Sequence, residues 1–345
     1  MRKPRAKSLQ IRNFILENIK AHPRDIARFT ANEFRISRTA VLRHINKLKE
    51  EGSITVAGST KDRHYELKPI SNETFSFEIS PEIEEDQIWR HIIRPLLMNV
   101  PEDVLRICEY GLSEMINNVI DHSEGTKSII HINQFVPRLE IMLVDDGIGI
   151  FKKIQRDKDL SDPRHAILEL AKGKLTTDPS RHTGEGIFFT SRMFDDFVIL
   201  SEGLFFSHNE PSDDWLIEQN ADVRGTTVAM GINPNSERII QDVFDMYASE
   251  EFDYEFSKTH VPLSLATYED ENLISRSQAR RLLARFHQFQ EVLLDFQGIA
   301  SIGQAFADEI FRIYVRNNPD VEIIAINTND QIDKMIARAQ RFNTS

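Results

Sequence analysis

Two side chains spaced four residues apart could hold a hard metal ion beside an activated water. Glu114 and Asn118 lie in a segment whose apolar residues recur with helical spacing, so both fall on one face of a helix. A carboxylate and an amide oxygen at this spacing can orient water and bind Mg²⁺, which prefers oxygen ligands. A polar, solvated helix face explains the same pair, so the spacing alone does not decide the chemistry.

Two glycine-containing segments further along the chain would let a ligand approach the backbone. Asp146, Gly147 and Gly149 follow an apolar run that is typical of a buried strand. Gly184 and Gly186 precede a helical segment, where free backbone N–H groups and the helix dipole favour an anion such as phosphate. An ordinary turn explains either segment when it is considered by itself.

The elements that position these residues alternate between helix and strand. The apolar pattern predicts helices over residues 84–98, 101–122 and 187–194, and strands over residues 74–79, 127–135, 139–144 and 197–200. The pattern lapses over residues 151–183, where we expect one helix, over residues 164–171. A stretch of this length in a compact domain is more often functional than accidental.

Four motifs, taken in order, resemble the GHKL ATP-binding domain of DNA gyrase, histidine kinases, mismatch-repair ATPases and anti-sigma-factor serine kinases. They are Glu114-x-x-x-Asn118, Asp146-Gly147-Ile148-Gly149, Thr183-Gly184-Glu185-Gly186 and Gly225-Thr226-Thr227-Val228. The segment around Glu114, residues 113–122, is most similar to the anti-sigma-factor branch. The four motifs in this order are specific, although no single one of them is.

The resemblance implies a central α/β two-layer sandwich, the Bergerat ATP-binding fold, over residues 72–233, with ATP and Mg²⁺ as ligands. Glu114 would orient or deprotonate an attacking water or hydroxyl, and Asn118 would ligate Mg²⁺. Asp146 would accept a hydrogen bond from the adenine amino group. The other implied ligand contacts are those of Asp121, Gly147, Gly149, Thr183, Gly184, Gly186 and Thr227. Residues 151–183 would form an ATP lid.

The first 68 residues carry a strong positive charge. They hold 16 Lys and Arg against 7 Asp and Glu, a net charge of +9; because the whole chain carries −12, the remaining residues carry −21. Helices are expected over residues 8–21, 24–30 and 38–51, and strands over residues 53–56 and 64–67. A basic module on an acidic body indicates that this part of the chain contacts a polyanion.

This order of elements resembles a winged helix-turn-helix domain, whose third helix enters the DNA major groove. The residues expected at DNA are Ser37, Arg38, Thr39, Arg43 and Lys47 on the third helix, and Lys61 and Arg63 in the wing. Their outward guanidinium and ammonium groups would contact phosphates and base edges. A winged helix that contacts protein, with its charges solvated, is the alternative.

The last part of the chain, residues 250–345, again alternates strands and helices. Helices are expected over residues 275–286, 305–316 and 331–342, and strands over residues 291–296 and 321–327. Residues 292–308 are similar to a STAS-like module of unknown function. Anti-anti-sigma proteins of the STAS type carry a phosphorylatable serine where this chain has Ala305, so we expect no self-phosphorylation there. A solvated outer face, with an anion site as the alternative, is expected for Arg276, Arg280, Arg281 and Arg285.

The composition is that of a globular protein, with 40% hydrophobic and 28% charged residues. No apolar run approaches the roughly 20 residues of a membrane span, and the basic start leads into no apolar signal core. The single cysteine, Cys108, cannot form an internal disulfide. We therefore expect a cytoplasmic protein without membrane attachment.

Together these features predict a multidomain protein of mainly α/β and α+β structure. It would comprise a winged helix over residues 1–68, an ATP-binding domain over residues 72–233 and a STAS-like α/β domain over residues 250–345. We expect a transcriptional regulator that couples Mg-ATP binding, and hydrolysis, to DNA binding. The STAS-like domain would contact a protein partner, and a homodimer is left open. Two alternatives use the same pocket: a serine/threonine kinase of the anti-sigma type that phosphorylates a separate protein, and a nucleotide sensor without hydrolysis.

Overall fold

The chain forms two compact units in the computed structural model. One comprises Met1–Phe75, Ile130–Met142 and Gly231–Ser236, and the other Ser76–Ile129, Leu143–Met230 and Glu237–Ser345. The structure describes residues 6–59, 62–97, 99–176, 183–209, 212–218, 224–248, 255–267 and 272–341. Among these residues, no helix is both long and apolar enough to cross a membrane.

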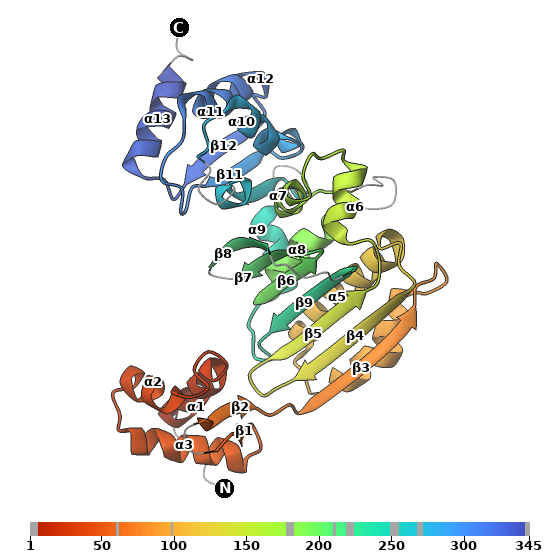
Figure 1. The fold of residues 1–345 in the computed structure, drawn as a ribbon, viewed down its shortest axis with the longest axis vertical. Coiled ribbons are helices and arrows are strands. Elements are labelled where there is room, and N and C mark those ends of the chain that lie inside the picture. The colour runs from red at the N-terminus through yellow and green to blue at the C-terminus, as the bar shows by residue number, and fades with distance from the viewer. Residues whose placement is uncertain are drawn as a thin grey trace. The chain divides into compact units, whose positions relative to one another are not determined.

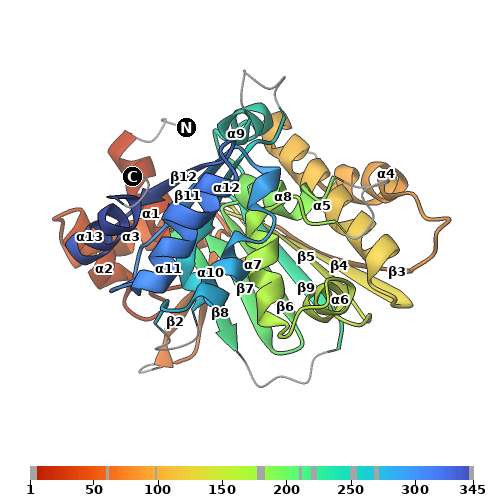
Figure 2. The same ribbon diagram turned by 90° about the horizontal axis from the view of Figure 1, so that it is seen from above.

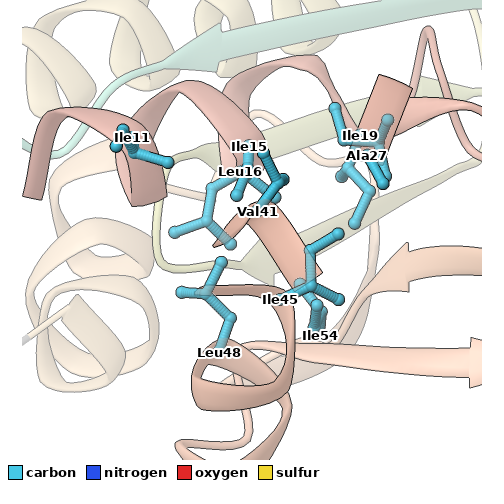
Figure 3. Packing of buried hydrophobic residues seen from close by; sticks show 10 residues of the cluster. Ile11, Ile15, Leu16, Ile19, Ala27, Val41, Ile45, Leu48 and Ile54 are labelled. Atoms are coloured by element: carbon cyan, nitrogen blue, oxygen red, sulfur yellow. The ribbon is translucent and has the colours of Figure 1, made fainter. Parts of the chain in front are cut away.

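Three helices and a two-stranded sheet form the N-terminal part (red in Figure 1). The elements are α1 (Ala6–Asn18), α2 (Ile26–Glu33), α3 (Arg38–Glu50) and the antiparallel strands β1 (Ile54–Ala57) and β2 (His64–Leu67). Ser37 caps α3, since its hydroxyl accepts a hydrogen bond from the Ala40 amide at 3.2 Å. Figure 3 shows their common core, which contains Ile11, Ile15, Leu16, Ile19, Ala27, Val41, Ile45, Leu48 and Ile54.

The central part is built on a seven-stranded sheet of order β3-β4-β5-β9-β6-β7-β8. The strands are β3 (Ser71–Glu78), β4 (Lys127–Gln134), β5 (Leu139–Asp145), β6 (Asp196–Ser201), β7 (Leu204–Asn209), β8 (Ser212–Glu218) and β9 (Thr226–Ile232). Alternate residues of β4 and β5 are buried, as in a sheet covered on one face. Helices α5 (Glu102–His122) and α8 (Gly186–Met193) cover that face (Figure 2).

The packing of α5 against α8 depends on Gly111. A Cβ atom at this position would lie 2.5 Å from the Phe194 ring and 3.0 Å from the Thr190 methyl group.

The segment before α5 differs from the single helix that was predicted. It consists of α4 (Glu85–Ile88), the π-helical η2 (Trp89–Ile93) and the 3₁₀-helical η3 (Arg94–Leu97). These helix types change the spacing of buried residues, so an apolar pattern does not distinguish them from one α-helix.

Two helices follow β5, of which the sequence predicted only the second. They are α6 (Ile150–Asp157) and α7 (Arg164–Lys172). The expectation of a single helix between residues 151 and 183 was wrong, because α6 buries only Phe151 and Ile154. Two apolar residues in a mostly charged helix give a weak periodic signal.

The C-terminal part (blue in Figure 1) has a three-stranded parallel sheet of order β10-β11-β12. It follows α9 (Ile240–Tyr247). Its elements are β10 (Lys258–Pro262), η5 (Leu263–Ala266), α10 (Arg276–Leu283), η6 (Phe286–Gln288), β11 (Glu291–Asp295), α11 (Gln304–Asp308), η7 (Glu309–Tyr314), α12 (Val315–Asn317), β12 (Glu322–Ile326) and α13 (Asp330–Arg341). Helix α10 ends before the predicted boundary, and Arg285 has a left-handed backbone with φ of 66°.

Candidate functional site

A cavity of about 290 Å³ opens beside α5, β5, β9 and the segments that flank α7 and α8. This volume lies at the lower end of the range for small-molecule sites. Its wall is formed by Glu114, Met115, Asn118, Val119, His122, Ser123, Asp145, Gly149, Ile150, Lys153, Ile154, Leu170, Leu175, Thr176, Thr183, Gly184, Gly186, Ile187, Phe188, Ile199, Thr226 and Val228. Both polar and apolar groups therefore face the cavity, as in a typical ligand site.

Helix α5 places a column of polar side chains along this cavity. Glu114, Asn118 and His122 follow one another at intervals of four residues, and all three line the wall. The predicted pair is thus brought to one site. His122 was missed, although its spacing from Asn118 was the available signal. Asp121, which was predicted to contact the ligand, does not line the cavity. It directly precedes His122, and one residue along a helix corresponds to about 100° of rotation, so the two side chains leave the helix in different directions.

The acid that faces the cavity is Asp145 rather than Asp146. Asp145 is 6% exposed, and its Oδ1 accepts hydrogen bonds from the amides of Gly147 at 2.8 Å and Thr226 at 3.3 Å. Burial raises the pKa of this carboxyl, and the two amide hydrogen bonds oppose the rise. A buried acid that ends a strand can accept a hydrogen bond from a ligand in the cavity.

Asp146 does not line the cavity, and its carboxylate instead accepts hydrogen bonds from the start of β4 and the residue before it. Its Oδ1 accepts hydrogen bonds from the amides of Thr126 at 2.7 Å and Lys127 at 2.9 Å, and its Oδ2 accepts one from the Thr126 hydroxyl at 2.7 Å. These bonds, first the one from the Lys127 amide, lower the pKa of Asp146 to about 2. The structure therefore corrects the prediction that Asp146 faces the ligand.

The site residue predicted on β9 is also one position away from the one that lines the cavity. Thr226 lines the cavity, and its hydroxyl oxygen accepts a hydrogen bond from the Ile150 amide at 3.0 Å. The predicted Thr227 is not part of the wall, since successive side chains of a strand point to opposite faces. Thr226 thus connects β9 both to Asp145 and to the start of α6.

The two glycines after Asp146 serve protein packing. A Cβ atom at Gly147 would lie 2.1 Å from the carbonyl oxygen of Ser123, and Gly147 does not line the cavity. Gly149 does line it; its φ of 87° favours glycine, and a Cβ atom there would lie 2.6 Å from the Ser201 hydroxyl. The loop therefore packs closely against the end of α5, which brings Asp145 and the polar column of α5 to one cavity.

The second glycine segment lies opposite Glu114. Thr183, Gly184 and Gly186, which were predicted to contact the ligand, all line the cavity. A Cβ atom at Gly186 would lie 2.0 Å from Glu114 Oε2, so the glycine gives this carboxylate room at the start of α8. The backbone N–H groups at this helix start are suited to an anion that reaches Glu114 and Asn118.

Charged groups lie in and beside the wall of the cavity. Lys153 of α6 lines the wall, and its Nζ lies 2.9 Å from Glu124 Oε1 and 3.3 Å from Asp157 Oδ2. Burial raises the pKa of Glu185, and the nearby Lys174 opposes that rise. Lys153 was not predicted as a site residue, because its helix was not predicted.

The side chains of the wall could hold a hard cation only together with oxygen atoms from a ligand. Among the described residues, no three His, Cys, Asp or Glu side chains are grouped so that they could hold a metal ion. Asn118 could supply an oxygen atom on one side, beside a water molecule held by Glu114, and a ligand phosphate would have to supply the others. Mg²⁺ is commonly bound in this way, through one or two protein oxygens together with substrate phosphates.

The residues predicted at DNA have mixed surroundings. Arg38, Thr39 and Arg43 are exposed on α3, whereas the Nζ of Lys47 lies 3.7 Å from Glu50 and 3.8 Å from Glu51. Arg63 is exposed, with its guanidinium 5.6 Å from the centre of the Tyr65 ring. Lys61 lies outside the described residues. Three exposed side chains at the start and middle of α3 thus remain available for a partner.

Comparison with known proteins supports two parts of the chain. Residues 278–333 match a STAS-like domain of unknown function (DUF4325). The STAS-like character predicted for the C-terminal part is therefore confirmed over these residues. A sensor histidine kinase of Bacillus subtilis (strain 168), YvfT, is 23% identical over 183 residues, which are 53% of this chain and 44% of that protein. The chain thus aligns with less than half of that relative.

Proposed function

We propose that the cavity binds Mg-ATP and that the protein is an ATP-dependent regulator with a GHKL-type domain. The observation that carries this proposal is the meeting of Glu114, Asn118, Asp145, Thr226 and the glycine segment at one cavity. The similarity to a sensor histidine kinase supports it. When bound, Mg-ATP would supply a phosphoanhydride bond that the cation polarises for cleavage.

The roles of the residues follow from their places in the wall. Asp145, in place of Asp146, accepts a hydrogen bond from the adenine amino group, and Thr226, in place of Thr227, supports that contact. Asn118 ligates Mg²⁺, and the amides beside Gly184 and Gly186 bind phosphate oxygens. Glu114 orients a water molecule or hydroxyl and accepts its proton.

Replacing Asn118 by alanine should remove most of the gain in ATP affinity that Mg²⁺ provides. Loss of an outer-shell group that only supports a metal ligand already costs about 10- to 100-fold in metal affinity, so loss of a direct ligand should cost about tenfold or more. Calorimetric titration with ATP, in Mg²⁺ and in EDTA, measures the effect. Asn117→Ala is the matched control, because Asn117 lies on the same helix but not in the cavity wall. Equal Mg²⁺ dependence in the two variants would contradict the assignment.

We further propose that the N-terminal part binds DNA as a winged helix, with α3 in the major groove. This proposal is supported by the net charge of +9 over the first 68 residues and by the exposed Arg38, Thr39 and Arg43 on α3. Lys47 contributes less, because two carboxylates lie near it. The regulator would then couple the nucleotide bound by one domain to the DNA bound by another.

Arg38→Ala and Arg43→Ala should each weaken binding to duplex DNA and flatten its dependence on salt. Each phosphate contact contributes about 0.9 to the slope of log K against log salt, so each variant should lose close to that amount. Fluorescence anisotropy with a labelled duplex of mixed sequence provides the measurement. Arg28→Ala is the control, because Arg28 is an exposed arginine of α2 that pairs with Asp25 at 2.9 Å. An unchanged slope in both α3 variants would favour the protein-binding alternative.

A further inference from the structure

Helix α7 lies between the cavity and the STAS-like domain. Leu170 lines the cavity, as do Leu175 and Thr176 just after the helix. Glu169 and Lys172 are instead buried, with 7% and 0% exposure, and they contact residues of α10 and the segment that follows it. The segment 169–176 thus serves as a wall of the cavity and as a contact surface for the other domain.

Lys172 caps the end of α10. Its ammonium donates hydrogen bonds to Glu169 Oε1 at 2.6 Å, to the carbonyl oxygen of Ala284 at 3.0 Å and to that of Arg281 at 3.3 Å. A cation stabilises the partial negative charge of free carbonyls at a helix C-terminus. On the other side, the Thr259 hydroxyl donates to the carbonyl oxygen of Lys172 at 2.7 Å. Burial lowers the pKa of Lys172 to about 8.

Arg285 binds the same segment at two points of its backbone. Its Nη2 donates to the carbonyl oxygen of Glu169 at 2.7 Å, and its Nη1 donates to that of Lys174 at 2.8 Å. Its Nε donates to Glu169 Oε2 at 2.6 Å. The Arg285 side chain is 16% exposed and does not lie on a solvated helix face, which corrects that prediction.

The positions of these two carbonyl groups relate Arg285 to the cavity. Glu169 directly precedes Leu170, and Lys174 directly precedes Leu175, and both leucines line the wall. One planar guanidinium therefore fixes the backbone next to each of them. A lysine could pair with the Glu169 carboxylate, but its single ammonium cannot reproduce the three-point geometry.

We propose that Arg285 is a positioning residue by which the STAS-like domain holds the α7 wall of the nucleotide site. The inference rests on the proposed ATP binding, and it assigns the C-terminal domain a direct part in that site. Because coupling between two sites is reciprocal, a partner that moves the STAS-like domain would change nucleotide affinity, and nucleotide binding would change affinity for that partner.

The test compares Arg285→Lys with Arg281→Ala in the full chain. Arg281→Ala is the control, because the Arg281 side chain is exposed and Lys172 contacts its backbone carbonyl, which the substitution keeps. Arg285→Lys should weaken Mg-ATP binding about fivefold or more by calorimetry. It should also speed hydrogen exchange of the amides of residues 170–176, while Arg281→Ala changes neither. Arg285→Lys keeps the charge beside Glu169, so the domain is expected to fold.

Wild-type ATP affinity in Arg285→Lys would overturn the inference, whether or not hydrogen exchange changes. If the unmodified protein does not bind Mg-ATP, the proposed function fails, and hydrogen exchange then decides the inference about the wall. Faster exchange in residues 170–176 of Arg285→Lys would keep Arg285 as the residue that positions the wall. Unchanged exchange would reject that role as well.

Discussion

Replacing Asp145 by asparagine is expected to weaken Mg-ATP binding by roughly 10- to 150-fold, the cost of losing a hydrogen bond to a buried charged group. The variant keeps an oxygen that can accept from the amides of Gly147 and Thr226. It replaces the second oxygen by an amino group, which would face the amino group of adenine. Two donors then oppose each other in a buried site.

Asp146→Asn is the matched control, because it makes the same chemical change one residue along the chain. The carboxylate of Asp146 accepts hydrogen bonds from Thr126 and Lys127 and does not line the cavity. Calorimetry should therefore give an affinity within about twofold of the wild-type value, a change too small for a lost charged hydrogen bond. A larger loss in Asp146→Asn than in Asp145→Asn would reverse the assignment.

Glu114→Gln should reduce ATP turnover by about 100-fold or more while ATP affinity stays close to the wild-type value. A positioned general base commonly contributes 10²- to 10⁴-fold to a rate, and an amide cannot accept the proton. The Glu114 carboxylate also has little freedom, since its Oε2 lies beside the Cα of Gly186, where even a methyl group would collide. Phosphate release and calorimetric affinity, measured on the same sample, separate the rate from binding.

Glu185→Gln serves as the control for Glu114→Gln. Glu185 lies in the same glycine segment, but it does not line the cavity and interacts with Lys174. Its loss should leave turnover largely intact. If Glu185→Gln abolishes turnover and Glu114→Gln does not, the base has been misassigned. If the wild-type protein leaves ATP intact, the sensor alternative is favoured, and label transferred to a copurified protein would favour the kinase alternative.

The sequence predicted which segments meet at the site more accurately than which side chain of each segment faces it. Asp145 and Asp146 are adjacent at the end of a strand, and Thr226 and Thr227 are adjacent within one. A motif places such a pair at the site but does not determine its rotation, and a shift of one residue moves a strand side chain to the other face. Only the register of the folded sheet resolves it.

The contacts of Arg285 could not be predicted for a related reason. Helical spacing over residues 275–286 placed Arg285 beside Arg281 on an outer face. The helix instead ends at Leu283, and the left-handed backbone at Arg285 changes the direction of its side chain. The end of this helix is capped by Lys172, which is distant in the sequence. The spacing of apolar residues within a helix carries no information about such a contact, so helix ends are predicted poorly.

The N-terminal helices and most strands were predictable because their apolar residues are regularly spaced and buried together. Val41, Ile45 and Leu48 on α3 all lie in the core, and their spacing places Arg38 and Arg43 outside it. Helix α6 buries only two apolar residues, so its sequence has no regular apolar spacing from which the helix could be predicted.

Because the ammonium of Lys172 is buried between α7 and the STAS-like domain, the stability of this contact depends on pH. Its pKa is about 8 in the folded chain against an ordinary value of 10.5, so between these two pH values the unfolded chain holds a proton that the folded chain has released. The free energy of unfolding contributed by this group therefore rises with pH across that interval. Below pH 8 both states are protonated, and the fold must bury the charge between Glu169 and Arg285 at a cost in stability. Because the cluster of Glu169, Lys172 and Arg285 costs stability at neutral pH, its role is better explained by the fixed position that it gives to the backbone of residues 169–174.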